Sequence, residues 1–156
     1  MNYHNPVMLA ETLAHLKVVE SGKYIDMTLG DGGHTLEILK KGGKVLGVEI
    51  NKDALERAEA RINDEGLQEN FTPCLGNFRD IDTLVSSTEF TKVNGIIYDL
   101  GYSSFQLDET ELGLSFRSDA PLDMRLTSDL GVTAADLVNS FSEKELTKII
   151  FCSTKR

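Results

Sequence analysis

The sequence is poor in cysteine and lacks long apolar runs, and each shortage excludes a class of protein. Cys74 and Cys152 are the only two cysteines and lie far apart, which argues against a disulfide framework or a structural zinc site. No stretch approaches the roughly 18 uninterrupted apolar residues of a membrane span, and the first residues lack the basic and apolar regions of a signal peptide. We therefore expect a cytoplasmic protein with no membrane partner.

Basic residues are also scarce, since 16 Lys and Arg stand against 25 Asp and Glu and give a formal net charge of −9. A protein that grips naked nucleic acid through many phosphate contacts needs clustered Lys and Arg. Any RNA partner is therefore expected to be bound through a local surface of this chain or elsewhere. The 156 residues, 40% of them apolar, suffice for one domain with a buried core.

The dinucleotide-binding pattern G-x-G-x-x-G is absent, and the chain has Gly30-x-Gly32-Gly33 after an apolar run instead. A second apolar run follows and ends in an acid, Glu49. A glycine turn at the carboxyl end of a strand lets a ligand approach the backbone, and an acid at the end of the next strand can accept hydrogen bonds from both ribose hydroxyls of an adenosine. The pattern favours a site for an adenosine-containing cofactor over an ordinary strand-to-helix turn.

Apolar runs and helical spacings alternate along the first two thirds of the chain. They predict an opening helix with Asn5 as its N-cap and Pro6 at its first position. The elements predicted after it are strands over residues 23–27, 44–48, 71–75 and 93–98, and helices over residues 35–41 and 51–63. Strands that alternate with helices predict an α/β fold with a parallel sheet, whose ligands bind at the carboxyl ends of the strands.

After Asp99 the pattern changes to a long, poorly periodic stretch that extends to about Gly131. Long loops inside compact domains are usually functional or disordered. Two short helices are predicted beyond it, over residues 133–139 and from Ser142, where Ser142 and Glu145 have the spacing of a capping box.

Several side chains near the strand ends have both a chemical and a structural interpretation. Asp99 can face a ligand at the strand ends or cap backbone N–H groups of its own loop. Tyr102 can stack on a base or close that loop. His34 can be a buried histidine at a helix start, a metal ligand or a cofactor contact, but neither His4 nor His15 lies at a spacing that would make it a second metal ligand. We therefore predict no metal site.

Five ordered motifs occur together in this chain, preceded by His4-x-Pro6-Val7-Met8. They are Asp26-Met27-Thr28-Leu29-Gly30-x-Gly32-Gly33-His34-Thr35, Gly76-Asn77-Phe78, Asp99-Leu100-Gly101-x-Ser103-Ser104-x-Gln106-Leu107-Asp108, Gly113-x-Ser115-Phe116 and Pro121-Leu122-Asp123-Met124-Arg125. Together they resemble the 16S ribosomal RNA cytosine-N4 methyltransferase family. The chain is similar to a short or C-terminally truncated member, and the likeness fades after Asn139.

The resemblance implies an enzyme that uses S-adenosylmethionine to methylate the exocyclic N4 of a cytidine in small-subunit 16S rRNA. The cofactor contacts that it implies, beside Gly30 of the glycine turn, are Gly32, Gly33 and His34 near the methionine, Glu49 at the ribose, Phe78 at the adenine, and Asp99 and Gln106. Glu49 stands where aspartate is usual in the family. In this reaction the enzyme must mainly orient the amine. Asp99 and the Leu100 carbonyl are then expected to accept hydrogen bonds from N4, and Tyr102 to stack on a flipped base.

The resemblance also implies a Rossmann-like methyltransferase fold with an incomplete sheet, because members of the family are about twice this length. It divides the chain into a methyltransferase core with the cofactor site, residues 1–105, and a substrate-side loop with the beginning of a helical insertion, residues 106–156. The sheet should have about four strands, and the outer edge of the fourth should be uncovered. That edge would be an association hazard unless a partner or the C-terminal helices cover it, and a homodimer is one way to cover it.

Two alternative functions stay open at this point. One is an inactive, truncated fragment that still binds S-adenosylmethionine, since part of the acceptor pocket is missing. The other is a nucleotide-dependent oxidoreductase of Rossmann type, which Glu49 permits and the absent G-x-G-x-x-G opposes. If the chain is a methyltransferase, its acidic character favours the structured small ribosomal subunit over naked RNA as the partner.

Overall fold

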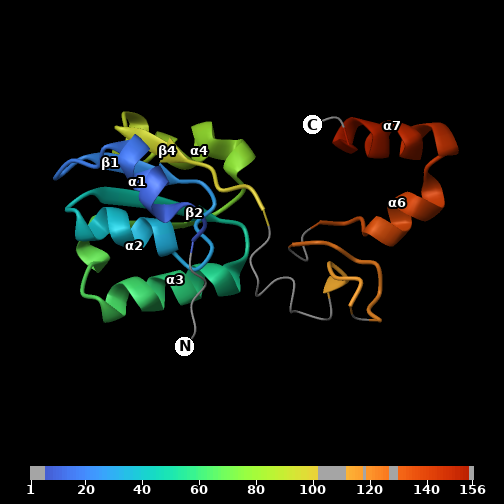
Figure 1. The fold of residues 1–156 in the computed structure, drawn as a ribbon, viewed down its shortest axis with the longest axis horizontal. Coiled ribbons are helices and arrows are strands. Elements are labelled where there is room, and N and C mark those ends of the chain that lie inside the picture. Colours follow the sequence, from blue (N-terminus) through green and yellow to red (C-terminus); the bar gives the residue numbers. More distant parts are fainter. Residues whose placement is uncertain (1–5, 102–111, 118, 127–129, 155–156) are drawn as a thin grey trace. The chain divides into compact units, whose positions relative to one another are not determined.

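The computed structural model describes residues 6–101, 112–117, 119–126 and 130–154. The chain divides into two compact units, Met1–Ser103 and Ser104–Arg156 (Figure 1). The residues with a predicted role that lie outside the described ones are His4, Asn5, Tyr102 and Gln106.

The first unit is built around a parallel sheet of four strands. They are β1 (Lys23–Asp26), β2 (Lys44–Glu49), β3 (Phe71–Leu75) and β4 (Gly95–Ile97). Their order is β3-β2-β1-β4, and all neighbours pair in parallel. The predicted α/β fold is confirmed, with β4 at one edge of the sheet. The strand predicted over residues 93–98 is shorter at both ends, and its carboxyl end lies at Ile97 because the Asp99 N–H bonds the Thr28 hydroxyl instead of continuing the sheet.

Helices cover both faces of this sheet (Figure 1). Those on one face are α1 (Leu9–Leu16), α2 (Gly33–Lys40) and α3 (Lys52–Asp64), and those on the other are α4 (Ile81–Ser86) and the 3-10 helix η3 (Glu89–Thr91). Two more 3-10 helices flank β3, namely η1 (Gln68–Asn70) and η2 (Phe78–Asp80). Successive strand residues alternate between the two faces, so Tyr24 joins one apolar core and Ile25 the other.

The helix predicted over residues 51–63 is present as α3, and its N-cap is Asn51, whose Oδ1 accepts the Ala54 N–H at 3.0 Å. The predicted start of the opening helix is wrong. Helix α1 begins at Leu9, after Met8 with a φ of 54°, so Pro6 is not its first residue. The Pro6 ring lies against the glycine turn instead, where a Cβ on Gly33 would be 2.9 Å from it.

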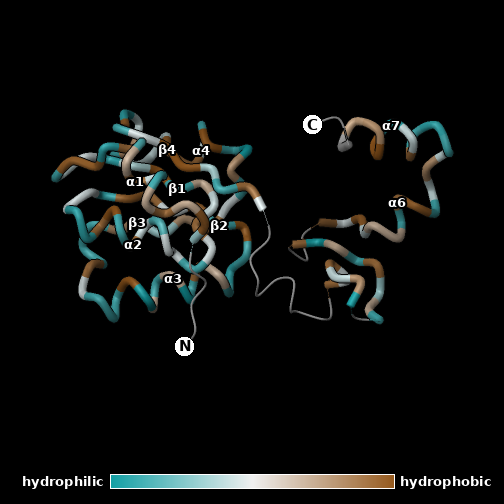
Figure 2. The backbone as a smooth tube through the Cα atoms, in the orientation of Figure 1, coloured by the Kyte–Doolittle hydropathy of each residue, from teal (hydrophilic) through white to brown (hydrophobic). Residues whose placement is uncertain are grey.

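The second unit contains helices α6 (Ala134–Ser140) and α7 (Glu143–Thr154). The predicted capping box before α7 is confirmed, since Glu145 Oε2 accepts the Ser142 N–H at 2.8 Å and the Ser142 hydroxyl accepts the Glu145 N–H at 3.4 Å. Hydrophobic residues recur along both helices (Figure 2), and several of them are exposed, for example Ile150 at 63%. None of the described helices is long and apolar enough to cross a membrane.

Candidate functional site at the carboxyl ends of the strands

The glycine turn after β1 adopts backbone conformations that favour glycine. Gly30 has a φ of 52° and Gly32 a φ of 73°. A Cβ on Gly30 would meet only the Thr28 carbonyl oxygen, at 4.0 Å, among the described residues, so this backbone borders open space. A Cβ on Gly32 would lie 3.3 Å from Ala58 of α3. Gly30 thus leaves room for a ligand, whereas Gly32 lets α3 pack closely.

The Glu49 carboxylate, at the end of β2, reaches the glycine turn. Its Oε2 accepts the Gly30 N–H at 2.9 Å, and its Oε1 accepts the N–H groups of Ile50 and Asn51 at 3.0 and 2.9 Å. An ionised carboxylate has about four acceptor positions, and three backbone donors occupy three of them. The remaining position on Oε2 can accept a hydrogen bond from a ligand.

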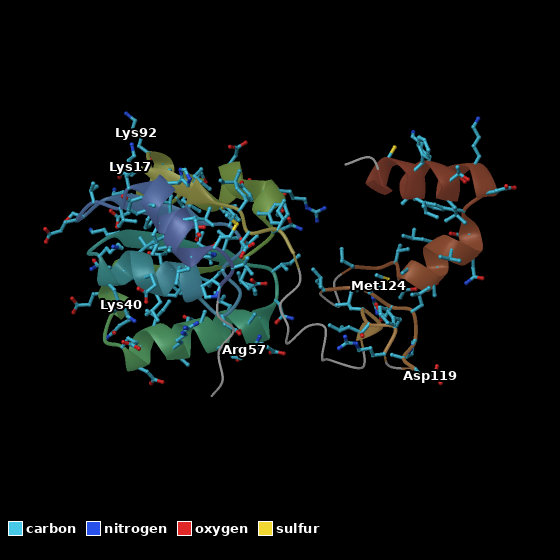
Figure 3. All side chains as sticks on the ribbon, in the orientation of Figure 1. Lys17, Lys40, Arg57, Lys92, Asp119 and Met124 are labelled. Carbon is cyan, nitrogen blue, oxygen red and sulfur yellow. The ribbon has the colours of Figure 1, made fainter. Side chains whose placement is uncertain are left out.

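Helix α3 anchors the middle of the turn. Arg57 Nε donates to Asp31 Oδ1 at 2.9 Å, and Arg61 Nη1 donates to the Asp31 carbonyl at 3.0 Å. The Asp31 side chain is mostly buried, at 11% exposed. Figure 3 shows Arg57 among the side chains of α3. Sequence reasoning missed this anchor, because the only local signal is a basic residue on the helix that follows β2.

The Asp26 carboxylate lies at the end of β1, beneath the surface of the site, and Asp26 is only 1% exposed. Its Oδ1 accepts the Thr28 N–H at 3.2 Å, and its Oδ2 accepts the Thr35 hydroxyl at 2.8 Å. Burial raises the pKa of Asp26 above its ordinary value, and the hydrogen bond from Thr35 opposes that rise. Asp26 therefore ties the end of β1 to the first turn of α2.

Asp99 meets the same turn from the end of β4. Its N–H donates to the Thr28 hydroxyl at 2.7 Å, and its Oδ2 lies 3.5 Å from His34 Nε2. His34 is 6% exposed, and its Nδ1 is buried without a hydrogen-bond partner among the described residues. The Asp99 side chain is 50% exposed, so its carboxylate stays accessible to a ligand. His34 and Asp99, far apart in the sequence, are therefore neighbours at one site.

Two aromatic rings meet near the ends of β3 and β4. The rings of Phe78 and Tyr98 have centroids 5.9 Å apart and planes at 85°, the favourable edge-to-face arrangement. Both side chains are partly exposed, Phe78 at 42% and Tyr98 at 47%. Phe78 is among the cofactor contacts implied by the family resemblance. Tyr98 was not predicted as a site residue, because the sequence pattern places it in the strand over residues 93–98.

The described site thus combines an open glycine backbone, an acid with a free acceptor position, an exposed aromatic ring and a half-exposed carboxylate. The structure places all of these where a parallel α/β sheet binds its ligands. Leu100 follows Asp99 and is 68% exposed. The predicted residues Tyr102 and Gln106 lie outside the described part of the chain, in which no group of three His, Cys, Asp or Glu residues could hold a metal ion.

Comparison with known proteins gives a family match over nearly the whole chain. The model of the MraW methylase family matches residues 1–155. Ribosomal RNA small subunit methyltransferase H from Clostridium botulinum is 44% identical over 150 residues, and its namesake from Carboxydothermus hydrogenoformans is 45% identical over 149. These matches cover 94% and 95% of this chain but 48% and 47% of the relatives. The chain spans about half the length of the curated relatives it matches.

Solved structures share the fold at lower identity. The C-terminal domain of precorrin-6Y C5,15-methyltransferase from Rhodobacter capsulatus superposes with a TM-score of 0.54 at 22% identity, over 65% of this chain and 52% of that chain. A Streptococcus mutans structure in complex with SAH superposes with a TM-score of 0.52 at 22% identity, over 66% of this chain and 56% of that chain. These likenesses place the sheet and its helices in the methyltransferase fold.

Proposed function

The chain belongs to the MraW methylase family, and from this we propose that it binds S-adenosylmethionine and takes part in methyl transfer to the N4 of a cytidine in 16S rRNA. The observation that carries the proposal is the contact between the glycine turn and Glu49, where the Gly30 N–H meets Oε2 at 2.9 Å. The relatives named as small-subunit methyltransferases support the substrate, and the structural neighbour that holds SAH supports the cofactor.

The described residues fit this cofactor at several points. The open backbone at Gly30 admits a ligand, and the free acceptor position of Glu49 suits a ribose hydroxyl. The exposed face of Phe78 suits the adenine ring. The remaining contacts that we propose are Gly32, Gly33, His34 and Asp99, with Gln106 outside the described residues.

The extra methylene of Glu49, relative to the aspartate usual in the family, has a use in this structure. It lets the carboxylate reach the Gly30 N–H and still accept the N–H groups of Ile50 and Asn51. We propose that the same carboxylate serves as the ribose acceptor.

S-adenosylmethionine, when bound, supplies a sulfonium methyl group that a nitrogen lone pair can attack. The N4 lone pair of cytosine is delocalised into its ring, so the protein must orient the amine and favour its pyramidal form. We propose that the half-exposed Asp99 carboxylate and the Leu100 carbonyl accept hydrogen bonds from N4, and that Tyr102 stacks on the flipped base. In this proposal residues 1–105 bind the cofactor, and residues 106–156 contribute to recognition of the substrate.

The partner that fits best is the assembled small ribosomal subunit in the cytoplasm. A chain with a net charge of −9 gains little from phosphate contacts, so we expect recognition of a structured particle by shape and a few contacts. The edge strand β4 offers a second contact surface, because Ile96 is 44% exposed beside strand groups that can pair further. We propose that a second copy of the chain or another protein covers this edge.

Transfer of a labelled methyl group to undermodified small subunits tests the proposed activity. We expect the chain to label the subunit RNA, with much less label on a naked short oligonucleotide of the same sequence. Asp99→Asn should lower transfer, because an amide accepts fewer hydrogen bonds than a carboxylate. Cofactor binding without any transfer would contradict the proposed activity and would support the alternative of an inactive chain that only binds S-adenosylmethionine.

A further inference from the structure

We propose that Thr28 is a positioning residue of this site, whose hydroxyl holds Asp99 against the glycine turn. The inference rests on the proposed function, in which Asp99 contacts the cofactor and the amine. Thr28 itself is given no contact with either. Its effect passes through a single hydrogen bond, from the Asp99 N–H to the Thr28 hydroxyl at 2.7 Å.

This hydrogen bond replaces a bond of the β-sheet. Strands β1 and β4 pair as far as Asp26 and Ile97, and the Met27 N–H then bonds the Ile97 carbonyl at 3.0 Å. A regular parallel ladder would next join the Asp99 N–H to the Met27 carbonyl. The Thr28 hydroxyl takes that N–H instead. The side chain of Thr28 therefore sets the place where the chain leaves the sheet.

Thr28 can position Asp99 because hydrogen bonds hold the backbone at Thr28 and at Leu29 in place. Its own N–H donates to the buried Asp26 carboxylate at 3.2 Å, and that carboxylate also accepts the Thr35 hydroxyl at 2.8 Å. The next residue, Leu29, donates its N–H to the Val48 carbonyl of β2 at 3.1 Å. The position of the Thr28 hydroxyl is thus defined by β1, β2 and α2 together.

The consequence is a fixed place for the Asp99 carboxylate. Its Oδ2 lies 3.5 Å from His34 Nε2, while half of the side chain remains exposed. If the Thr28 hydroxyl is removed, the Asp99 N–H loses its acceptor and can turn to water. The carboxylate then samples several positions, and a ligand that needs it in one of them binds more weakly.

Two substitutions of Thr28 separate its hydroxyl from its shape. Thr28→Val keeps the branched shape without the hydroxyl, and Thr28→Ser keeps the hydroxyl without the methyl group. In calorimetric titration with S-adenosylmethionine we expect Thr28→Val to lower the affinity roughly tenfold and Thr28→Ser to stay within about twofold. Equal losses in the two variants, or no loss in Thr28→Val, would overturn the proposal.

Thr88→Val is the matched control. The Thr88 hydroxyl donates to the Val85 carbonyl at 2.9 Å and accepts the Phe90 N–H at 3.1 Å, before β4 rather than after it. Its removal should lower the stability of the unit and leave the cofactor affinity unchanged. If Thr88→Val weakened binding as much as Thr28→Val, the Thr28 effect would be one of general stability, and the proposal would be wrong.

A double-mutant cycle tests whether Thr28 acts through Asp99. In an Asp99→Ala background, Thr28→Val should cost little further affinity, because the carboxylate that it positions is gone. A full tenfold loss in that background would show that Thr28 acts elsewhere and contradict the proposal.

Hydrogen exchange of the Asp99 amide, followed by NMR, keeps this test separate from the proposed function. We expect exchange about tenfold faster in Thr28→Val and unchanged in Thr28→Ser, in the absence of any ligand. If that pattern holds while the unsubstituted chain fails to bind S-adenosylmethionine, the proposed function fails and the role of Thr28 in placing Asp99 stands. Unchanged exchange in Thr28→Val would refute that role directly.

Discussion

At the scale of single residues, the buried Asp26 carboxylate should contribute to the way stability depends on pH. Burial raises its pKa above the ordinary 3.8, so the folded chain binds this proton more tightly than the unfolded chain does. The stabilisation that follows is complete below the unfolded pKa and is lost as the pH rises through the folded pKa.

Asp26→Asn should remove this dependence, because an amide does not titrate and can still bond Thr28 and Thr35. We expect the unfolding free energy of the unsubstituted chain, relative to that of Asp26→Asn, to fall as the pH rises from about 4 to 8. Urea denaturation of both chains across this range measures the difference. A difference that stays constant with pH would contradict the burial of an ionisable Asp26.

We expect the Tyr98 ring to hold the Phe78 ring, the proposed adenine contact, in its orientation through their edge-to-face contact. An aromatic pair of this kind is worth about 0.5–1.5 kcal/mol, which corresponds to roughly a two- to tenfold change in affinity. Tyr98→Leu should therefore weaken S-adenosylmethionine binding by that factor in calorimetry, and Tyr98→Phe should not. Equal affinities for the Leu and Phe variants would show that the ring contact does not matter.

At the scale of elements, the sequence predicts the buried strands and their helices well, because side-chain periodicity reports burial directly. Strand β3 has its predicted bounds, and the capping box before α7 lies where it is predicted. The start of α1 and the length of β4 could not be predicted, since they depend on contacts between distant residues. Pro6 packs on Gly33, and Thr28 takes the N–H of Asp99.

The same limit applies to the candidate site. Glu49 and the glycine turn are recognisable because each follows a strand, and the motifs add Phe78 and Asp99. The contact between Arg57 and the glycine turn forms only when α3 packs beside the turn. The contact between Phe78 and Tyr98 likewise forms only when the end of β4 lies beside the Phe78 ring. Residue spacing along a single element holds no information about such pairs.

Helix α3 should depend measurably on its N-cap. Asn51→Ala removes the acceptor for the Ala54 N–H and should lower the unfolding free energy by about 1 kcal/mol in urea denaturation. Asn63→Ala, an exposed position near the other end of the helix, serves as the control and should change stability by less than about 0.5 kcal/mol. If the two variants were equally stable, the cap would contribute nothing.

At the scale of the whole molecule, β4 is an edge strand of the sheet and can pair with a strand of a partner. We expect the chain to self-associate as its concentration rises, in sedimentation velocity experiments. Ile96→Lys should abolish the association, because it puts a charge at a half-exposed position of the edge strand β4. Leu75→Lys, on the opposite edge strand β3, should not. Association lost in Leu75→Lys alone would place the contact at β3 and contradict the proposal.

The central claim is that the glycine turn and Glu49 hold S-adenosylmethionine, and calorimetric titration of the chain with S-adenosylmethionine and with NAD tests it most directly. We predict saturable binding of S-adenosylmethionine, weakened at least tenfold in Glu49→Gln, because an amide NH₂ cannot accept the N–H groups that the carboxylate faces. Glu56→Gln, on the exposed face of α3, should bind like the unsubstituted chain. Binding of NAD in place of S-adenosylmethionine, or undiminished binding by Glu49→Gln, would contradict the account.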